Sequence, residues 1–335
     1  MKIAVIGAGA IGCLVAGYLK LKDEDVYLVG RSEVVRAIKK EGLKISGVRG
    51  DFRISLPVYE RLNSQKELVI LATKTQDVEQ AIKENLIFLK NTPILTTQNG
   101  IQADEIVARY IPKEEIISSI IMFAATYLQP GKIVHNFEGN WIMGRPFNGD
   151  SDEKIISLSL VLNKIFPLQI TPEIQGMKYL KIFVNANNCI PAILGLSMQE
   201  AFKDLEISRL GIAIWKEGFR IISQLKIKLV SLPGFPVENL IKLISLDSDE
   251  AARIFSAMML NLSKEPLYGS ILQSIKRQRP SEIDYINGEF VRLAKENDLN
   301  APLNERLVEM VHQVEKNRRF LSRDELITAT RRLIN

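Results

Sequence analysis

The sequence predicts an α/β domain built on a parallel sheet over residues 1–171, followed by an all-α domain over residues 172–335. Three observations support this fold class. Apolar strand-like segments alternate with helix-like segments through the first half. A glycine-rich turn joins the first strand to the first helix. From Pro172 onward the apolar pattern becomes helical, with few strand signals, and 335 residues are enough for two domains.

The composition excludes several classes of protein. Apolar residues make up 46% and charged residues 25% of the chain, as in ordinary globular proteins. The net charge of +5 is mild and scattered, which argues against a nucleic-acid surface but suits an anionic small molecule. Two cysteines, Cys13 and Cys189, argue against a disulfide scaffold and a cysteine metal site. No run of apolar residues is long enough to span a membrane and the start does not read as a signal peptide, so we expect a cytoplasmic enzyme.

The first element is a strand, KIAVI, at residues 2–6. It is followed at once by GAGAIG, in which Gly7, Gly9 and Gly12 have the G-x-G-x-x-G spacing, and then by a helix-like run. Between a strand and a helix, this motif indicates a Rossmann-type dinucleotide site. Gly7 permits the tight turn, Gly9 lets the backbone approach a pyrophosphate, and Gly12 lets the helix pack on the strand. The helix N-terminus attracts the phosphates. A tight turn without a ligand is the less favoured interpretation.

The second strand, DVYLVG at residues 25–30, indicates which dinucleotide binds. An NAD enzyme usually has an acidic residue at the end of this strand, where it holds the ribose hydroxyls. Here Gly30 and Arg31 occupy that place, and Asp25 lies at the opposite end. A guanidinium in place of a carboxylate favours a 2′-phosphate, and hence NADP(H). The alternative is that Arg31 is only a solvated residue at the start of a helix.

Two further strands are each followed by a polar residue. ELVILAT (67–73) precedes Lys74 and a helix from about Asp77, and TPILTT (92–97) precedes QNG and a helix from about Gln102. Lys74 and Asn99 therefore follow the carboxyl ends of strands, where α/β sheets bind ligands. A solvated lysine and a turn Asn-Gly are the alternatives. The strand-like runs IISSIIMF, KIVHNF, NWIMG and FPLQIT complete this half.

The segment KYLKIFVNANNCIP, residues 178–191, is apolar enough for a core helix but contains lysines and asparagines. Lys178, Lys181, Asn185 and Asn188 are spaced by three, four and three residues, which predicts one face of one helix. Such a face suits the lining of a ligand site between two domains. A solvated face is the alternative, although it would more usually carry Glu, Lys and Arg.

The rest of the second half contains helix boundaries. LPGFPVENL (232–240) predicts a break between helices, and SRDEL predicts a capping box for the last helix. In RPSEIDYINGEF (279–290), Ser281 is the expected N-cap of a helix whose dipole Glu282 would complement. His135, in a strand-like run, and His312, on an amphipathic segment, are expected to be packing or surface residues.

Together these residues resemble the ketopantoate reductase (2-dehydropantoate 2-reductase) family over nearly the full length of the chain. The most specific match is SILQSIKRQRPSEIDYING at 270–288, in which Ser270 and Glu282 keep the family's spacing of twelve. The other matching pieces are GAGAIG at 7–12, VGR at 29–31, Lys74, QNG at 98–100 and the K-x-x-x-N of Lys181 to Asn185.

The resemblance implies NADPH-dependent reduction of ketopantoate to pantoate, on the route to pantothenate and coenzyme A. It makes Lys181 the proton donor and gives Glu282 a catalytic role beside the substrate hydroxyl or the cofactor. The substrate-binding residues it implies are Asn99, Asn185, Asn188 and Ser270. The cofactor-binding residues it implies are Gly7, Ala8, Gly9, Ala10, Ile11, Gly12, Arg31, Lys74, Asn99 and Glu282. A homodimer through the helical domain is expected by analogy.

The chemistry of ketone reduction agrees with the choice of lysine. Hydride addition leaves an alkoxide, which needs a nearby proton donor or cation. A lysine with the ordinary pKa of about 10.4 is cationic at neutral pH and can serve as both. Neither histidine has a sequence context that suggests this role. Lys178 is the rival, and only the family's spacing to Asn185 favours Lys181.

Some positions depart from the family pattern and keep alternatives open. Many members have a second asparagine eight residues after the lysine, where this chain has Cys189, preceded by Asn187 and Asn188. Tyr179 replaces the usual tryptophan, and residues 226–264 cannot be aligned with the family residue by residue. A reductase of another 2-keto acid and a non-catalytic NADP(H)-binding protein therefore remain as alternatives. The joint presence of Lys181, Asn185, Ser270 and Glu282 argues against the latter, because binding a nucleotide needs none of them.

Overall fold

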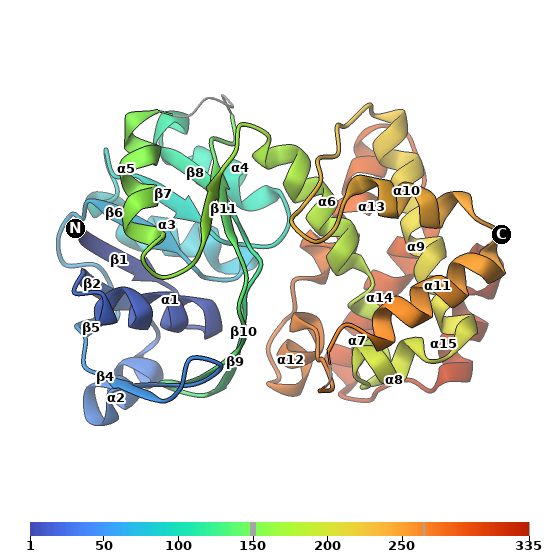
Figure 1. Ribbon diagram of the computed structural model, residues 1–335, viewed down its shortest axis with the longest axis horizontal. Helices are drawn as coiled ribbons and strands as arrows, with labels where there is room; N and C mark the ends of the chain where they lie inside the picture. Colours follow the sequence, from blue (N-terminus) through green and yellow to red (C-terminus); the bar gives the residue numbers. More distant parts are fainter. Residues whose placement is uncertain (148–151, 264, 335) are drawn as a thin grey trace. The chain divides into compact units, whose positions relative to one another are not determined.

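The computed structural model describes residues 1–147, 152–263 and 265–334. It divides into two compact units, Met1–Gln175 and Gly176–Asn335, which we describe separately. Figure 1 shows strands in the first unit and helices in the second, so the predicted α/β fold followed by an all-α region is confirmed. No helix within the described residues is both long and apolar enough to cross a membrane.

The main sheet of the first unit has eight strands in the order β12-β11-β8-β7-β6-β1-β2-β5. Its neighbouring strands are parallel, except that β11 runs antiparallel to β8. The strands are β1 (Lys2–Ile6), β2 (Asp25–Val29), β5 (Val58–Tyr59), β6 (Leu68–Leu71), β7 (Ile94–Thr96), β8 (Ile116–Ile121), β11 (Trp141–Gly144) and β12 (Leu168–Ile170). The strands expected around the glycine motif all form, and several end a residue or two before the predicted boundary.

Both faces of this sheet are covered. On β1, Ile3 and Val5 face a core shared with α1 and α5, whereas Ala4 and Ile6 face a second core shared with α3 and α4. This alternation follows from the two-residue period of a strand. The helices of this unit are α1 (Ala10–Leu21), α2 (Ser32–Glu41), α3 (Val78–Asn85), α4 (Gln102–Ala108) and α5 (Glu153–Leu162), with short 3₁₀ turns η1 (Thr75–Asp77), η2 (Leu86–Phe88) and η3 (Lys113–Glu115).

A second sheet, in the order β4-β3-β10-β9, lies against α1. A Cβ atom at Gly17 of α1 would come within 2.4 Å of the Ile45 side chain, so this glycine allows the close approach. Three of its four strands were not predicted from the sequence. The fourth, KIVHNF, was predicted as a strand, and it belongs to this sheet rather than to the main one. The strands are β3 (Leu43–Gly47), β4 (Phe52–Ile54), β9 (Ala124–Gln129) and β10 (Lys132–Phe137).

His135 of β10 is a fully buried packing residue beneath this second sheet. Its Nε2 lies 3.0 Å from the carbonyl oxygen of Phe137, which can only accept, so Nε2 carries the proton. Nδ1 then accepts a hydrogen bond of 2.9 Å from the Tyr18 hydroxyl. Burial lowers the pKa of His135, which keeps the imidazole neutral.

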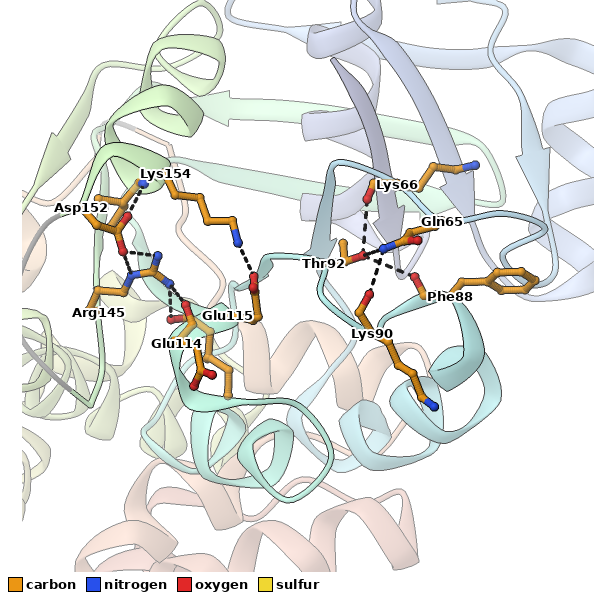
Figure 2. A network of polar contacts seen from close by, with 12 residues as sticks. Gln65, Lys66, Phe88, Lys90, Thr92, Glu114, Glu115, Arg145, Asp152 and Lys154 are labelled. Atoms are coloured by element: carbon orange, nitrogen blue, oxygen red, sulfur yellow. Dashed lines mark hydrogen bonds and ion pairs between the residues drawn. The ribbon is translucent and has the colours of Figure 1, made fainter.

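Polar clusters hold the amino-terminal edge of the main sheet together (Figure 2). The buried guanidinium of Arg145 contacts the Asp152 carboxylate at 2.5 Å and the Glu114 carbonyl oxygen at 2.6 Å. In the second cluster, the Thr92 hydroxyl lies 3.4 Å from the Lys66 carbonyl oxygen. The first cluster joins the residues before β8 to those after β11, and the second joins the residues before β6 to those before β7. The carboxyl ends of the strands, where this kind of sheet binds ligands, carry a different set of residues.

The second unit is helical, and within the described residues its only β contact is an isolated bridge between Leu232 and Phe235. Its long helix α9 packs on α11, α10 and α14. The ring centroids of Trp215 and Phe255 are 5.1 Å apart. The predicted break lies between α9 and α10, and the last helix begins with the expected Ser322 capping box. The helices are α6 (Ile174–Ala186), α7 (Cys189–Leu194), α8 (Met198–Phe202), α9 (Leu205–Gln224), α10 (Val237–Ser245), α11 (Ser248–Leu260), α12 (Ser270–Lys276), η4 (Ile283–Tyr285), α13 (Asn287–Glu296), α14 (Pro302–Asn317), α15 (Arg323–Thr330) and η5 (Arg331–Leu333).

Candidate active site

The glycine-rich turn lies between β1 and α1. Gly7 has φ of +115°, and a Cβ atom there would come within 2.5 Å of the Ala72 and Thr73 backbone. A Cβ atom at Gly12 would come within 1.9 Å of the Gly7 carbonyl oxygen. The fold itself therefore requires these two glycines. Gly9 is different, because a Cβ atom there would meet nothing within 4 Å. Its place is open, as close approach of a phosphate to the backbone requires.

Other polar groups surround this turn. Gly30 packs on Ala8, since a Cβ atom at Gly30 would be 2.5 Å from that of Ala8. Arg31 follows as the N-cap of α2, and its side chain is 61% exposed. The Thr73 hydroxyl oxygen is buried and has no hydrogen-bond partner among the residues that the structure describes. The backbone nitrogen of Thr73 lies beside the Gly7 position, so this residue is next to the glycine turn.

The loops that carry Lys74 and Asn99 are tied together. The Gln98 amide donates to the carbonyl oxygens of Leu71 at 2.8 Å and Thr73 at 2.9 Å. The Thr75 hydroxyl lies 3.5 Å from the Asn99 carbonyl oxygen. The ends of β6 and β7 therefore hold Lys74 and Asn99 at the same edge of the sheet, and both residues are half-buried. The sequence placed them after their strands but did not reveal the bridging role of Gln98.

In the second unit, Lys181 and Asn185 lie one turn apart on α6 and are both half-buried. Lys178, the rival lysine, is only 2% exposed. Burial lowers the pKa of Lys181 to about 8, well below the ordinary value assumed from sequence. The ammonium form is still the main one at neutral pH, but it releases its proton more readily than an ordinary lysine.

Asn188 does not lie on the same helix as Lys181, so the prediction of one continuous four-residue face is wrong. Helix α6 ends at Ala186, and Asn188 is the N-cap of α7. Pro191 supplies the physical reason, because it has no N–H to donate to the Asn187 carbonyl oxygen four residues earlier. That oxygen accepts instead from the Ile190 N–H, at 3.3 Å.

At the start of α7, the Asn188 side chain lies beside Gly269, the residue before Ser270. A Cβ atom at Gly269 would come within 3.0 Å of the Asn188 side chain, and Gly269 immediately precedes Ser270 at the start of α12. Asn188 is half-buried, whereas Asn187 is 1% exposed and Cys189 is fully buried. Burial also raises the pKa of Cys189 to about 12, so its thiol is inert. Among these three residues, Asn188 is the one with an accessible side chain.

The segment around Glu282 also differs from its prediction. Ser281 does not cap an α-helix, because the 3₁₀ turn η4 comes first and α13 begins only at Asn287. Ile283 and Ile286 are both fully buried. Ile283 begins the turn and Ile286 directly follows it, and both side chains enter the core. Glu282 precedes the turn and is half-buried.

Helix α14 anchors this segment through His312. The His312 imidazole lies 2.9 Å from the Asp284 carboxylate and 3.2 Å from the Glu315 carboxylate. Glu315 in turn accepts the Ser281 N–H at 2.8 Å. Although burial opposes it, hydrogen bonds and charge from Asp284 and Glu315 raise the pKa of His312. The sequence predicts only a packing or surface residue at His312. Asp284 is far from it in the chain, and Glu315, three residues away, does not by itself indicate a contact.

Comparisons with known proteins give the same family for both units. Residues 3–147 match the family described as Ketopantoate reductase PanE/ApbA, and residues 173–315 match Ketopantoate reductase PanE/ApbA C terminal. The 2-dehydropantoate 2-reductase of Pyrococcus horikoshii is 32% identical over 91% of this chain and 94% of that protein. The enzyme of the same name from Archaeoglobus fulgidus is 24% identical over 94% and 98%.

Solved structures extend the comparison. The ternary structure of D-mandelate dehydrogenase with NADH and anilino(oxo)acetate has a TM-score of 0.81 and 26% identity, over 95% of this chain and 99% of that one. A 2-dehydropantoate 2-reductase from Geobacter metallireducens, at TM-score 0.73 and 21% identity over 94% and 100%, shares the fold. A glycine-turn α/β unit followed by this helical unit thus defines a two-domain oxidoreductase. Within that class, the chain belongs to the ketopantoate reductase family.

Proposed function

We propose that the protein reduces ketopantoate to pantoate with NADPH, in the biosynthesis of pantothenate and coenzyme A. This proposal rests on the environment of Lys181. The side chain is half-buried one helical turn from Asn185, and burial lowers its pKa to about 8. The names of the matched relatives support the substrate. We also propose that the enzyme is a cytoplasmic homodimer formed through the helical unit.

The residues of the first unit fit a nicotinamide dinucleotide. The open position at Gly9 and the first turn of α1 suit its pyrophosphate, and the Thr73 hydroxyl offers a hydrogen bond. Arg31 would hold the 2′-phosphate, and Lys74 and Asn99 would hold other parts of the dinucleotide. We assign the remaining contacts to Ala8, Ala10 and Ile11 beside Gly7 and Gly12, with Glu282 from the helical unit. Bound NADPH supplies the hydride that reduces the ketone.

The second unit would hold the keto acid and supply the proton. The Lys181 ammonium polarises the ketone oxygen and donates its proton to that oxygen as negative charge develops there. It then regains a proton from solvent. Asn185, Asn188 and Ser270 offer neutral donors for the carboxylate and ketone, which avoids burying a second cation. Glu282 would accept a hydrogen bond from the substrate hydroxyl, and Asn99 would approach the substrate from the cofactor side.

The matched variants Lys181→Ala and Lys178→Ala test the assignment of the proton donor. We expect Lys181→Ala to lower kcat by about two to four powers of ten, the scale of a lost acid-base group, while NADPH still binds. Lys178→Ala should lower kcat far less, because its side chain is only 2% exposed and is not accessible to a ligand. Steady-state NADPH oxidation and equilibrium titration with NADPH measure the two effects. If the two variants exchange these results, Lys178 is the donor; if neither loses activity, the proposed chemistry is wrong.

A reductase of another 2-keto acid is the second candidate. The likeness to D-mandelate dehydrogenase favours it, because that structure carries NADH and an aryl-substituted oxoacetate. A panel containing ketopantoate, phenylglyoxylate and smaller branched 2-keto acids separates the candidates by kcat/KM. We expect the highest value with ketopantoate. A higher value with another acid would assign the protein to that substrate, and no turnover with any acid would favour a dinucleotide-binding protein without catalysis.

A further inference from the structure

Arg31 has a charged neighbour that lies far away in the sequence. Strands β2 and β6 pair with β1 on its two sides, and Arg31 follows β2 whereas Asp77 follows β6 through η1. The Nη2 atom of Arg31 lies 3.6 Å from Oδ2 of Asp77. The two side chains therefore meet from opposite sides of the glycine turn that β1 leads into. An acidic group missing from the end of β2 is thus supplied from the end of β6.

The Asp77 carboxylate has a favourable charge for the N-terminus of α3, and this effect is small at an exposed position. Asp77 occupies the N-cap position of α3, yet its side chain makes no capping hydrogen bond. The Arg31 and Asp77 side chains are 61% and 48% exposed. Ion pairs as exposed as this one contribute little to stability, because water screens them. The contact therefore bears mainly on what the Arg31 guanidinium can bind.

We propose that Asp77 sets the ratio of NADPH to NADH affinity by competing with the 2′-phosphate for Arg31, a role that rests on the proposed dinucleotide binding. The 2′-phosphate must draw the guanidinium away from Asp77 and approach a negative carboxylate. NADH has no phosphate to be repelled, and its 2′-hydroxyl can donate to a carboxylate. Asp77 thus narrows the preference for NADPH that Arg31 creates.

Equilibrium titrations of the full chain with NADPH and NADH, followed by nicotinamide fluorescence, test this role. We expect Asp77→Asn to bind NADPH about three- to tenfold more tightly, the effect of one charge roughly 4 Å away in water, with NADH affinity unchanged or weaker. Raising the salt concentration should shrink this gain. Glu84→Gln is the matched control, since it removes a negative charge from the same helix at an exposed residue bonded to Gln80. It should change neither affinity.

The Arg31→Ala background separates this inference from the proposed function. In the Arg31→Ala background, Asp77→Asn should change the ratio of affinities less than it does with Arg31 present, because the 2′-phosphate is still repelled but no guanidinium remains to compete for. An equally large change in both backgrounds, or an equal change for NADPH and NADH in the single variant, overturns the competition while leaving the cofactor site intact. If Arg31→Ala leaves NADPH affinity unchanged, the 2′-phosphate assignment itself fails. Binding of neither dinucleotide by the wild type would overturn the proposed function.

Discussion

Lys181 and Lys178 show how much the accessibility of two lysines can differ within one helix. Both lie on α6, three residues apart, and the sequence distinguishes them only by resemblance. In the structure Lys178 is nearly inaccessible, whereas Lys181 is half-buried and has a pKa that burial lowers to about 8. A donor must reach the substrate and release a proton near the working pH. The partial exposure and the lowered pKa of Lys181 are why we propose it, rather than Lys178, as the donor.

The pH dependence of the reaction follows from this lowered pKa. In the proposed mechanism, reduction requires the Lys181 ammonium, which is the main form below about pH 8 and is lost above it. We therefore expect kcat/KM for the keto acid to be level near neutral pH and to fall about tenfold per pH unit above about 8. Initial rates at saturating NADPH between pH 6 and 10 measure the profile. A profile that stays level to pH 10 would contradict the assignment, since an ordinary lysine would then suffice.

At the scale of elements, the helix after the Asn99 loop is fixed by a buried carboxylate. Asp104, in the first turn of α4, accepts hydrogen bonds from the Thr96 hydroxyl of β7 at 2.5 Å and the Ser118 hydroxyl of β8 at 2.6 Å. Asp104 is fully buried. One side chain thus joins a helix to two strands directly beside the loop that carries Asn99.

Removing this carboxylate should be costly. Asp104→Ala leaves two buried hydroxyls without their acceptor, and we expect a loss of about 1–3 kcal/mol in the free energy of unfolding. Glu105→Ala, at the exposed next residue, should change it by about 0.5 kcal/mol or less. Urea denaturation followed by circular dichroism compares the two. Equal losses would mean that α4 depends on helix propensity rather than on the Asp104 contacts.

Some elements of the fold can be predicted from the local sequence and others cannot. The order of strand, glycine turn and helix at residues 2–21 is local information, so periodicity and Gly7, Gly9 and Gly12 were enough to predict it. Strands such as β4 are three residues long and gain their stability from pairing with distant segments, which no local pattern reports. The end of α6 depends on Pro191, a residue beyond the predicted face. Asp77 escaped notice because it meets Arg31 only after the sheet has formed.

At the scale of the whole molecule, the two histidines act on stability in opposite directions. The pKa of buried His135 is lowered, so the unfolded first unit binds more protons below about pH 6.5, the ordinary value for histidine, and that unit loses stability there. Although partial desolvation opposes it, hydrogen bonds and charge from Asp284 and Glu315 raise the pKa of His312. Its stabilisation of the second unit is fully present below about pH 6.5 and is lost as the pH rises through the raised value.

The two tryptophans provide a separate reporter for each unit. Trp141 is buried in β11, where Phe123 and Phe166 connect its ring with that of His135, and Trp215 is buried in α9. As the pH is lowered from 7.5 to 5.5, we expect the urea midpoint reported by Trp141 to fall. The midpoint reported by Trp215 should fall less or rise. Trp215→Phe and Trp141→Phe variants isolate the two signals. His135→Gln should flatten the Trp141 trend, and an unchanged slope there would contradict the role given to His135.

The lowered pKa of Lys181 also makes it an unusually reactive amine near neutral pH, because more of it is in the neutral form. At pH 7.5 about a quarter of a lysine with a pKa near 8 is neutral, compared with about one in a thousand for a lysine with a pKa near 10.5. Only the neutral amine attacks acylating reagents and aldehydes. Even half-buried, Lys181 should therefore be modified earlier than the exposed lysines of this chain, and a bound keto acid should shield it. Covalent labelling would thus mark the residue independently of any assay of turnover.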